Sequence, residues 1–340
     1  MVATLAGVWM IVGLFLDGLA HVELRPDSFF TLWHLILYSG FLAAAAATVV
    51  PVIRRHRSRA SWSSAVPSGH RLTLIGVATF GAGAVLDLVW HQTVGFEVSN
   101  EALLSPSHLV LMFGALLALS GPVRSGWANL SSFSSLASWV PMVISLALLT
   151  GVALFFTSYL TPFGRQSAAT FPATTTHTHA LGTSNPAAFA QLREVWGVSG
   201  ILLSTLILVV PLMFILRRAR PALGAVTILG LAIGVLVPAL GEFTQWTAGI
   251  AVAVAFGVAD VVVRREQSTV VLGTVVALVF WAVYFIGLEL TDGVRWSPSL
   301  WAGTIVLASM VGAAVGLLVS QGAAPSVAGA TSGTSRPSSP

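Results

Sequence analysis

Three ionisable side chains near the start of the chain have the spacing of a metal site. Asp17 and His21 are separated by three residues, and His34 follows after twelve more. Residues four apart share one face of a helix, so this carboxylate and imidazole lie about 6 Å apart along the axis. His34 opens the next apolar segment beyond a short polar turn. We therefore expect all three side chains at a similar depth.

The same pattern returns seventy residues later. Asp87 and His91 repeat the pair with the same spacing, and His108 stands at the start of the following apolar segment. Two neutral imidazoles and one carboxylate form a ligand set with open coordination positions, which suits a metal bound for reaction. The repeat predicts two metal triads, or two halves of one joint site.

The sequence alone leaves the metal open. It contains no cysteine, which excludes thiolate sites, and none of its six methionines lies beside a triad along the chain. Copper, iron and zinc all accept the predicted ligands. Two other interpretations remain: each Asp and His can hydrogen-bond within one helix, or the six residues can form a proton or cation pathway.

Four glutamates are candidates for contacts behind the ligands. Glu97 and Glu101 lie in the segment before His108, and Glu242 and Glu289 lie near the ends of later apolar segments. Glu97 and Glu101 are candidates for an extra carboxylate on the second triad. Glu242 and Glu289 are expected either to contact a ligand or lie along the substrate path, or to be interfacial residues without a role.

The elements that carry these residues are transmembrane helices. Of 340 residues, 56% are hydrophobic and 8% are charged, whereas a soluble domain has roughly 25% charged residues. A bilayer-spanning helix needs about 20 apolar residues, and the hydropathy pattern predicts an all-α bundle of about ten spans. We expect these spans at 2–22, 29–53, 71–95, 106–123, 136–160, 195–216, 221–240, 247–263, 269–290 and 300–319.

The pattern divides the chain into three parts. Residues 1–123 form a duplicated two-helix metal-binding unit of four spans, and residues 124–320 form the remaining bundle with an external loop at 161–194. Residues 321–340 are rich in Ser, Gly, Ala and Pro and are expected to be a disordered tail. The seventh and eighth spans are short, so eight or nine full spans with a re-entrant piece also fit.

Arginine placement predicts the orientation. All sixteen basic residues are arginines, and twelve of them fall on one side of the predicted topology. The positive-inside rule places that side, with both termini, in the cytoplasm of a multi-pass cell-membrane protein. The triads then face outward, and the formal charge of +4 reflects topology and not nucleic-acid binding.

At the first triad the chain resembles the C subunit of the copper membrane monooxygenases, the family of particulate methane and ammonia monooxygenases. That subunit carries an Asp-x3-His-x12-His copper site in its membrane helices, and Asp17, His21 and His34 have identical spacing. The resemblance covers roughly residues 10–120. The remaining spans have no counterpart in that subunit that we can name.

The family has a second, related site further along the chain, which Asp87, His91 and His108 resemble with two differences. The first ligand of that site is Asn in the family and a carboxylate here, and the gap between the two histidines is longer here. Both differences concern the second site alone.

The resemblance implies a copper-dependent enzyme that activates oxygen and hydroxylates a small apolar substrate or ammonia. It also implies partner subunits, because the family works as a complex. A homo-oligomer is the alternative form of assembly. Two alternatives stay open: a metal-ion or proton-coupled transporter, and a non-catalytic copper-handling protein.

Overall fold

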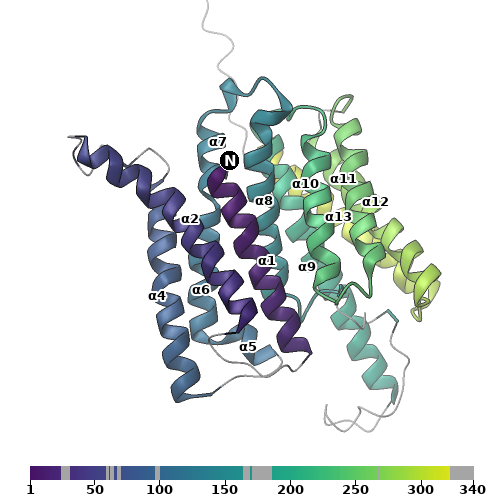
Figure 1. Ribbon diagram of the computed structural model, residues 1–340. Coiled ribbons are helices and arrows are strands. Elements are labelled where there is room, and N and C mark those ends of the chain that lie inside the picture. The colour runs from purple at the N-terminus through teal and green to yellow at the C-terminus, as the bar shows by residue number, and fades with distance from the viewer. Residues whose placement is uncertain are drawn as a thin grey trace, which may run out of the picture.

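All regular secondary structure among the residues that the structure describes is helical (Figure 1). The computed structural model describes residues 1–23, 31–58, 61, 65–66, 70–95, 100–163, 169–170, 186–266 and 268–321. The predicted all-α class is confirmed. In chain order the helices are α1 (Val2–Val22), α2 (Leu32–Arg57), α4 (Arg71–Thr93), α5 (Asn100–Leu104), α6 (Pro106–Leu119), α7 (Gly121–Ala128), α8 (Leu136–Phe156), α9 (Pro186–Leu216), α10 (Ala225–Ala239), α11 (Trp246–Val262), α12 (Thr269–Thr291) and α13 (Pro298–Gln321).

Within the described part of the chain, eight helical segments are long and apolar enough to cross a membrane, and α6 and α7 together form one of them. In lipid, a helix satisfies its backbone hydrogen bonds internally, which explains why apolar segments of this length are helical. The other two predicted spans are α10 and α11, of 15 and 17 residues. At 1.5 Å per residue they are about 22 Å and 26 Å long, shorter than a hydrocarbon core of about 30 Å.

The α10–α11 pair is a tight hairpin within the second half of the bundle. Glu242 and Phe243 in its turn have positive φ angles of 53° and 61°. The buried carboxylate of Asp260 accepts hydrogen bonds from the backbone N–H of Gly224, at 2.6 Å, and from the hydroxyl of Thr227, at 2.8 Å. Because the hairpin returns to the side on which it starts, α12 enters from that side whether the pair crosses the membrane or only dips into it.

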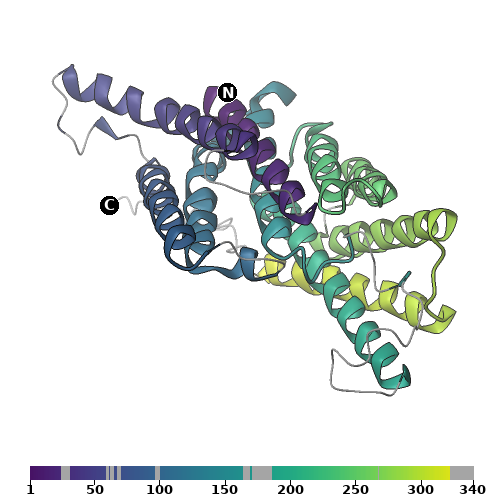
Figure 2. The same ribbon diagram turned by 60° about the horizontal axis from the view of Figure 1, so that its bottom comes forward.

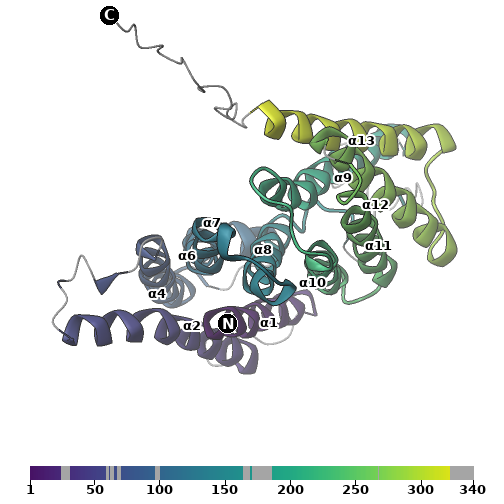
Figure 3. The ribbon, with the colours of Figure 1, turned by 90° about the horizontal axis from the view of Figure 1, so that it is seen from above.

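Two hydrophobic cores meet at α8, which lies between the N-terminal and the C-terminal helices (Figure 3). One core joins α1, α2, α4 and α6, and Leu148, Val152 and Phe156 of α8 complete it. The other core is formed mainly by the six consecutive helices from α8 through α13, and Met142 and Val143 are among the residues that α8 contributes. Helix α8 therefore belongs to both halves, which were predicted to separate at residue 123.

The two N-terminal hairpins, α1–α2 and α4–α6, pack in the same way. A Cβ on Gly40 would lie 2.6 Å from the Cα of Met10, and a Cβ on Gly114 would lie 2.7 Å from the Cα of Phe80. Both glycines are therefore required for the close approach of the paired helices. The equivalent residues are offset by seventy in the first helix of each hairpin and by seventy-four in the second, like the triads.

The ends of the helices that bear arginines also lie together. Arg124 of α7 donates to the hydroxyl of Thr73 in α4 at 2.6 Å. The guanidinium of Arg218 lies 5.3 Å from the ring centroid of Trp127, and Arg220 donates to the carbonyl oxygen of Val263. These contacts join α4, α7, α9 and α11 at the end opposite to the triads.

Candidate metal centre

Each triad is assembled where two antiparallel helices meet. The aspartates and the first histidines lie in the last turns of α1 and α4, while His34 and His108 are the third residues of α2 and α6. Helices α1 and α4 run toward the same end of the molecule and α2 and α6 run back from it, so both triads lie at that end (Figure 2).

A hydroxyl residue precedes each of these helices and contacts its histidine. The Oγ1 of Thr31 lies 3.0 Å from the Nδ1 of His34. The Oγ of Ser105 accepts a hydrogen bond from the backbone N–H of His108 at 3.4 Å. Hydroxyl residues are favoured at this N-cap position. The spacing of hydroxyl, two residues and histidine occurs at both sites and was a signal that the sequence analysis missed.

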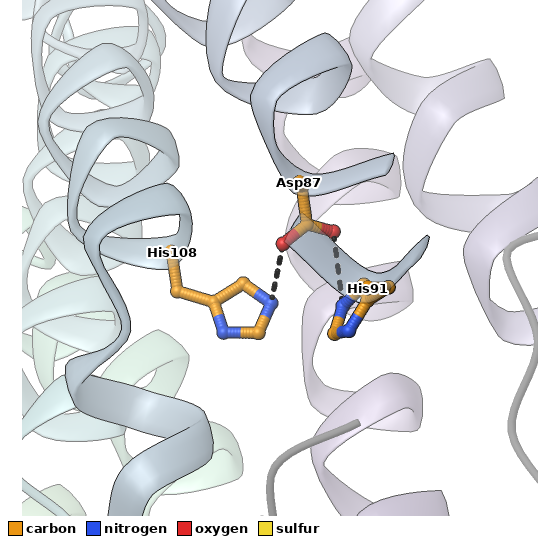
Figure 4. A group of neighbouring side chains, drawn as sticks. All are labelled: Asp87, His91 and His108. Atoms are coloured by element: carbon orange, nitrogen blue, oxygen red, sulfur yellow. Dashed lines mark ion pairs between the residues drawn. The ribbon is translucent and has the colours of Figure 1, made fainter. Parts of the chain in front are cut away.

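The second triad is already close to the geometry of a metal site (Figure 4). One oxygen of the Asp87 carboxylate lies 3.1 Å from the Nε2 of His108, and the other lies 3.4 Å from the Nε2 of His91. Neighbouring ligands around a tetrahedral ion with bonds of about 2.1 Å are about 3.4 Å apart. One ligand atom from each of the three residues falls within 4.8 Å of the others.

Hydrogen bonds behind the two rings make these contacts unfavourable without a cation. The Nδ1 of His91 lies 3.3 Å from the carbonyl oxygen of Gly95, and the Nδ1 of His108 contacts that of Ala102. A carbonyl oxygen only accepts, so Nδ1 carries the proton and Nε2 of a neutral ring is an acceptor. Two acceptors then face each other unless a proton or a metal ion lies between them.

The burial of the Asp87 carboxylate also favours a cation between it and the histidines. Asp87 is 2% exposed, and its Oδ1 has no hydrogen-bond partner among the described residues, although the Nε2 of His108 is 3.1 Å away. A buried carboxylate oxygen without a hydrogen bond is costly. Metal-bound histidines commonly donate their second nitrogen to a backbone carbonyl, which is the arrangement here. The residues of the second triad therefore fit a transition metal.

The first triad is less regular. The Oδ1 of Asp17 lies 3.2 Å from the Nε2 of His34 and 3.6 Å from the Nδ1 of His21. That same Nδ1 is 3.0 Å from the backbone carbonyl oxygen of Asp17, which holds the ring along its own helix. Among the described residues, the three side chains do not form a group within 4.8 Å as the second triad does. The first triad is therefore less well arranged for a metal ion than the second.

Both triads open onto one cavity of about 150 Å³. Five of the six triad residues line it, all except His91, and Tyr38 and Ser158 are the other polar side chains in its wall. The rest of the wall is mostly apolar and includes Leu14, Phe15, Phe80, Phe155, Phe156 and Leu240. An apolar cavity of about 150 Å³ in another protein accommodates benzene or xenon, so this one admits a ligand of a few heavy atoms.

Two methionines reach the cavity although neither is next to a triad in the sequence. Met112 lies one turn after His108 on α6, and Met10 lies two turns before Asp17 on α1. Long side chains on helices lean toward the N-terminus, so Met112 leans toward His108. Sequence reasoning missed these thioethers, because only the packing of the helices brings them to the cavity.

The four glutamates do not join the described wall of the cavity. Glu97 lies outside the described residues, and the side chain of Glu101, in α5, is also outside them. Glu242 lies in the turn between α10 and α11. Glu289 is exposed on α12 and accepts a hydrogen bond from the backbone N–H of Val294 at 2.8 Å. The external loop 161–194 and the tail 321–340 lie mostly outside the described residues.

Comparison of the chain with protein-family models, with curated proteins and with solved structures finds no match.

Proposed function

We propose that the protein is an integral membrane copper protein related in chemistry to the membrane monooxygenases. The observation that carries the proposal is the pair of Asp-His-His triads, built from equivalent helix ends and opening onto one apolar cavity. Copper bound at the triads would supply the activation of dioxygen for hydroxylation of a small apolar molecule or ammonia.

The chain's own residues have distinct tasks in this proposal. The imidazoles of His91 and His108 hold the metal through Nε2, with their rings oriented by backbone carbonyls. The Asp87 carboxylate offsets part of the positive charge in a site that excludes water. Aromatic side chains such as Phe80 and Phe155 limit the size of the substrate and shield the reaction from water.

The donor set favours copper over harder metals. Imidazole suits copper, zinc and iron, whereas thioether sulfur is a soft ligand that selects Cu(I). Met10 and Met112 place thioethers in the wall of the cavity that holds the triads. Zinc and iron remain the alternatives that metal analysis must exclude.

We place the arginine-rich end in the cytoplasm of the cell membrane and the triads on the external side. Both termini are then cytoplasmic. Partner subunits or a second copy of the chain are part of the proposal through the resemblance to the monooxygenase family.

Metal analysis of the purified full chain in mild detergent tests the proposal. We expect His21→Ala and His91→Ala each to lose about one equivalent of copper, because each removes a ligand from a different triad. His56→Ala, at the opposite end of α2, is the matched control and should keep all copper. Full retention of metal by both triad variants would exclude the metal site, and loss of zinc or iron instead would exclude the family assignment.

A further inference from the structure

A second cavity, of about 380 Å³, lies at the arginine-rich end of the same half of the molecule. We call it the inner cavity, and we call the cavity that the triads line the outer cavity. The first turns of α1, α4 and α8 and helix α7 contribute to its wall. The hydroxyl oxygen of Thr4, a residue that is 3% exposed, and the Nδ1 of His70 are buried there without hydrogen-bond partners among the described residues. A buried polar atom without a hydrogen bond is costly, so these two atoms favour a bound ion, polar ligand or water in this cavity.

Met10 lines both cavities. It is 1% exposed and lies about 12 Å along α1 from Val2 and about 10 Å from Asp17. Met142 also lines the inner cavity, with its sulfur against Gly126. Met112 lines the outer cavity, one turn after His108 on α6. The thioethers therefore occupy successive depths between the inner cavity and the second triad.

The charges around the inner cavity select the class of ion. No carboxylate belongs to the described wall of this cavity. Arg124 donates to the wall residue Thr73, so it brings a positive charge close to the cavity. Hard divalent cations such as Ca²⁺ and Mg²⁺ need carboxylate oxygens among their ligands, which the described side chains of this wall do not offer. Neutral sulfur, hydroxyl and imidazole donors instead suit a soft monovalent cation.

We propose that the inner cavity is a loading site for Cu(I) and that Met10 is the thioether through which the ion passes to the outer cavity. The proposal rests on the proposed function, since it assumes that the triads bind copper. Copper enters and moves as Cu(I), so the passage requires no electron transfer. The route supplies copper to the triads from the end of the molecule opposite to them.

The first test measures sulfur bound to copper, by X-ray absorption, in the full chain loaded with Cu(I). We expect a copper–sulfur signal in the wild type and in His91→Ala, and a clear loss of it in Met10→Leu and in Met142→Leu. Leucine is close to methionine in volume, so these variants are expected to fold. Met213→Leu is the matched control, since Met213 is equally buried but lines neither cavity.

The second test measures the rate at which the triads fill in vesicles when Cu(I) is offered to one face only. From the arginine-rich face, Met10→Leu should slow loading about tenfold or more, because a soft ligand on the route is lost. From the triad face, loading should not change.

The outcomes separate the two proposals. Equal sulfur signals and equal loading rates in Met10→Leu and Met213→Leu would overturn the Cu(I) route. Equal copper content in His91→Ala and the wild type, with the methionine-dependent signal still present, would instead overturn the triads as metal sites. Bound lipid or anion in the inner cavity, with no effect of Met10→Leu on Cu(I) binding, would also overturn the route.

Discussion

The substitution Asp87→Asn tests the electrostatic argument at the second triad. Asparagine has nearly the shape of aspartate but no charge, and its amide N–H can donate to the Nε2 of a neutral histidine. In the wild type, the carboxylate oxygens lie 3.1 Å and 3.4 Å from the Nε2 atoms of His108 and His91. We therefore expect the variant to fold well without metal and to bind metal weakly.

The size of the effect follows from the geometry. Two unit charges separated by 3.1 Å, the distance between the Asp87 oxygen and the Nε2 of His108, interact by about 5 kcal/mol at an effective dielectric constant near 20. An ion bound between these two atoms lies closer to the carboxylate, so this value is a lower limit for its attraction to a bound cation. The amide oxygen of asparagine can still act as a ligand and recovers part of this energy. We expect a net loss of about 3 to 4 kcal/mol of metal-binding free energy, which raises Kd on the order of 10²- to 10³-fold.

Two measurements on detergent-purified protein check this expectation: copper affinity by competition with a chelator, and Tm with and without metal. At a metal concentration about 100 times Kd, binding stabilises the wild type by about 2.7 kcal/mol. At the same concentration the variant should gain less than about 0.5 kcal/mol. Its metal-free Tm should equal or exceed that of the wild type, because two facing acceptors are replaced by a donor and an acceptor.

Either of two results would refute the reasoning. One is a copper Kd within about threefold of the wild type; the other is a metal-free variant that unfolds well below the wild type. Asp260→Asn is the control, because Asp260 is as buried as Asp87 but binds Gly224, Thr227 and Arg264 at the other end of the molecule. It should lower Tm and leave copper affinity unchanged.

Three further predictions address packing, the second half and pH. Gly114→Ala should cost about 1 to 3 kcal/mol and reduce copper at the second triad, because the new Cβ would meet Phe80; Gly257→Ala, with nothing within 4 Å of its Cβ, should do neither. Tyr284→Phe should lower stability by about 1 kcal/mol without loss of metal, since the buried hydroxyl donates to the carbonyl oxygen of Pro162 at 3.0 Å; unchanged urea unfolding would contradict this. Copper affinity should fall as the pH is lowered, since protons compete with the metal for imidazole nitrogens, and an affinity that does not change with pH in chelator competition would argue against histidine ligands.

The chain also illustrates where hydropathy stops being informative. Segments 221–240 and 247–263 are apolar enough to predict spans, yet α10 has only 15 residues, while α11 has 17, the length that was predicted. Helix α10 is short mainly because it begins at Ala225, after Gly224 with its positive φ of 92°. An apolar helix buried between other helices and one facing lipid have the same composition, so length alone separates them.

The sequence by itself determined the membrane class, the helices and the pairing of Asp17 with His21 and of Asp87 with His91. These features depend on hydropathy and on the helical repeat, which act between residues close in the chain. Only the tertiary structure decided that both triads share one cavity and that Met10 lines a second one. It also decided that the second triad is tighter than the first, because ring orientation depends on carbonyls in the connecting segments. The shared cavity depends on contacts between helices that are distant in sequence, such as α1, α6 and α8, and no local pattern specifies which faces meet.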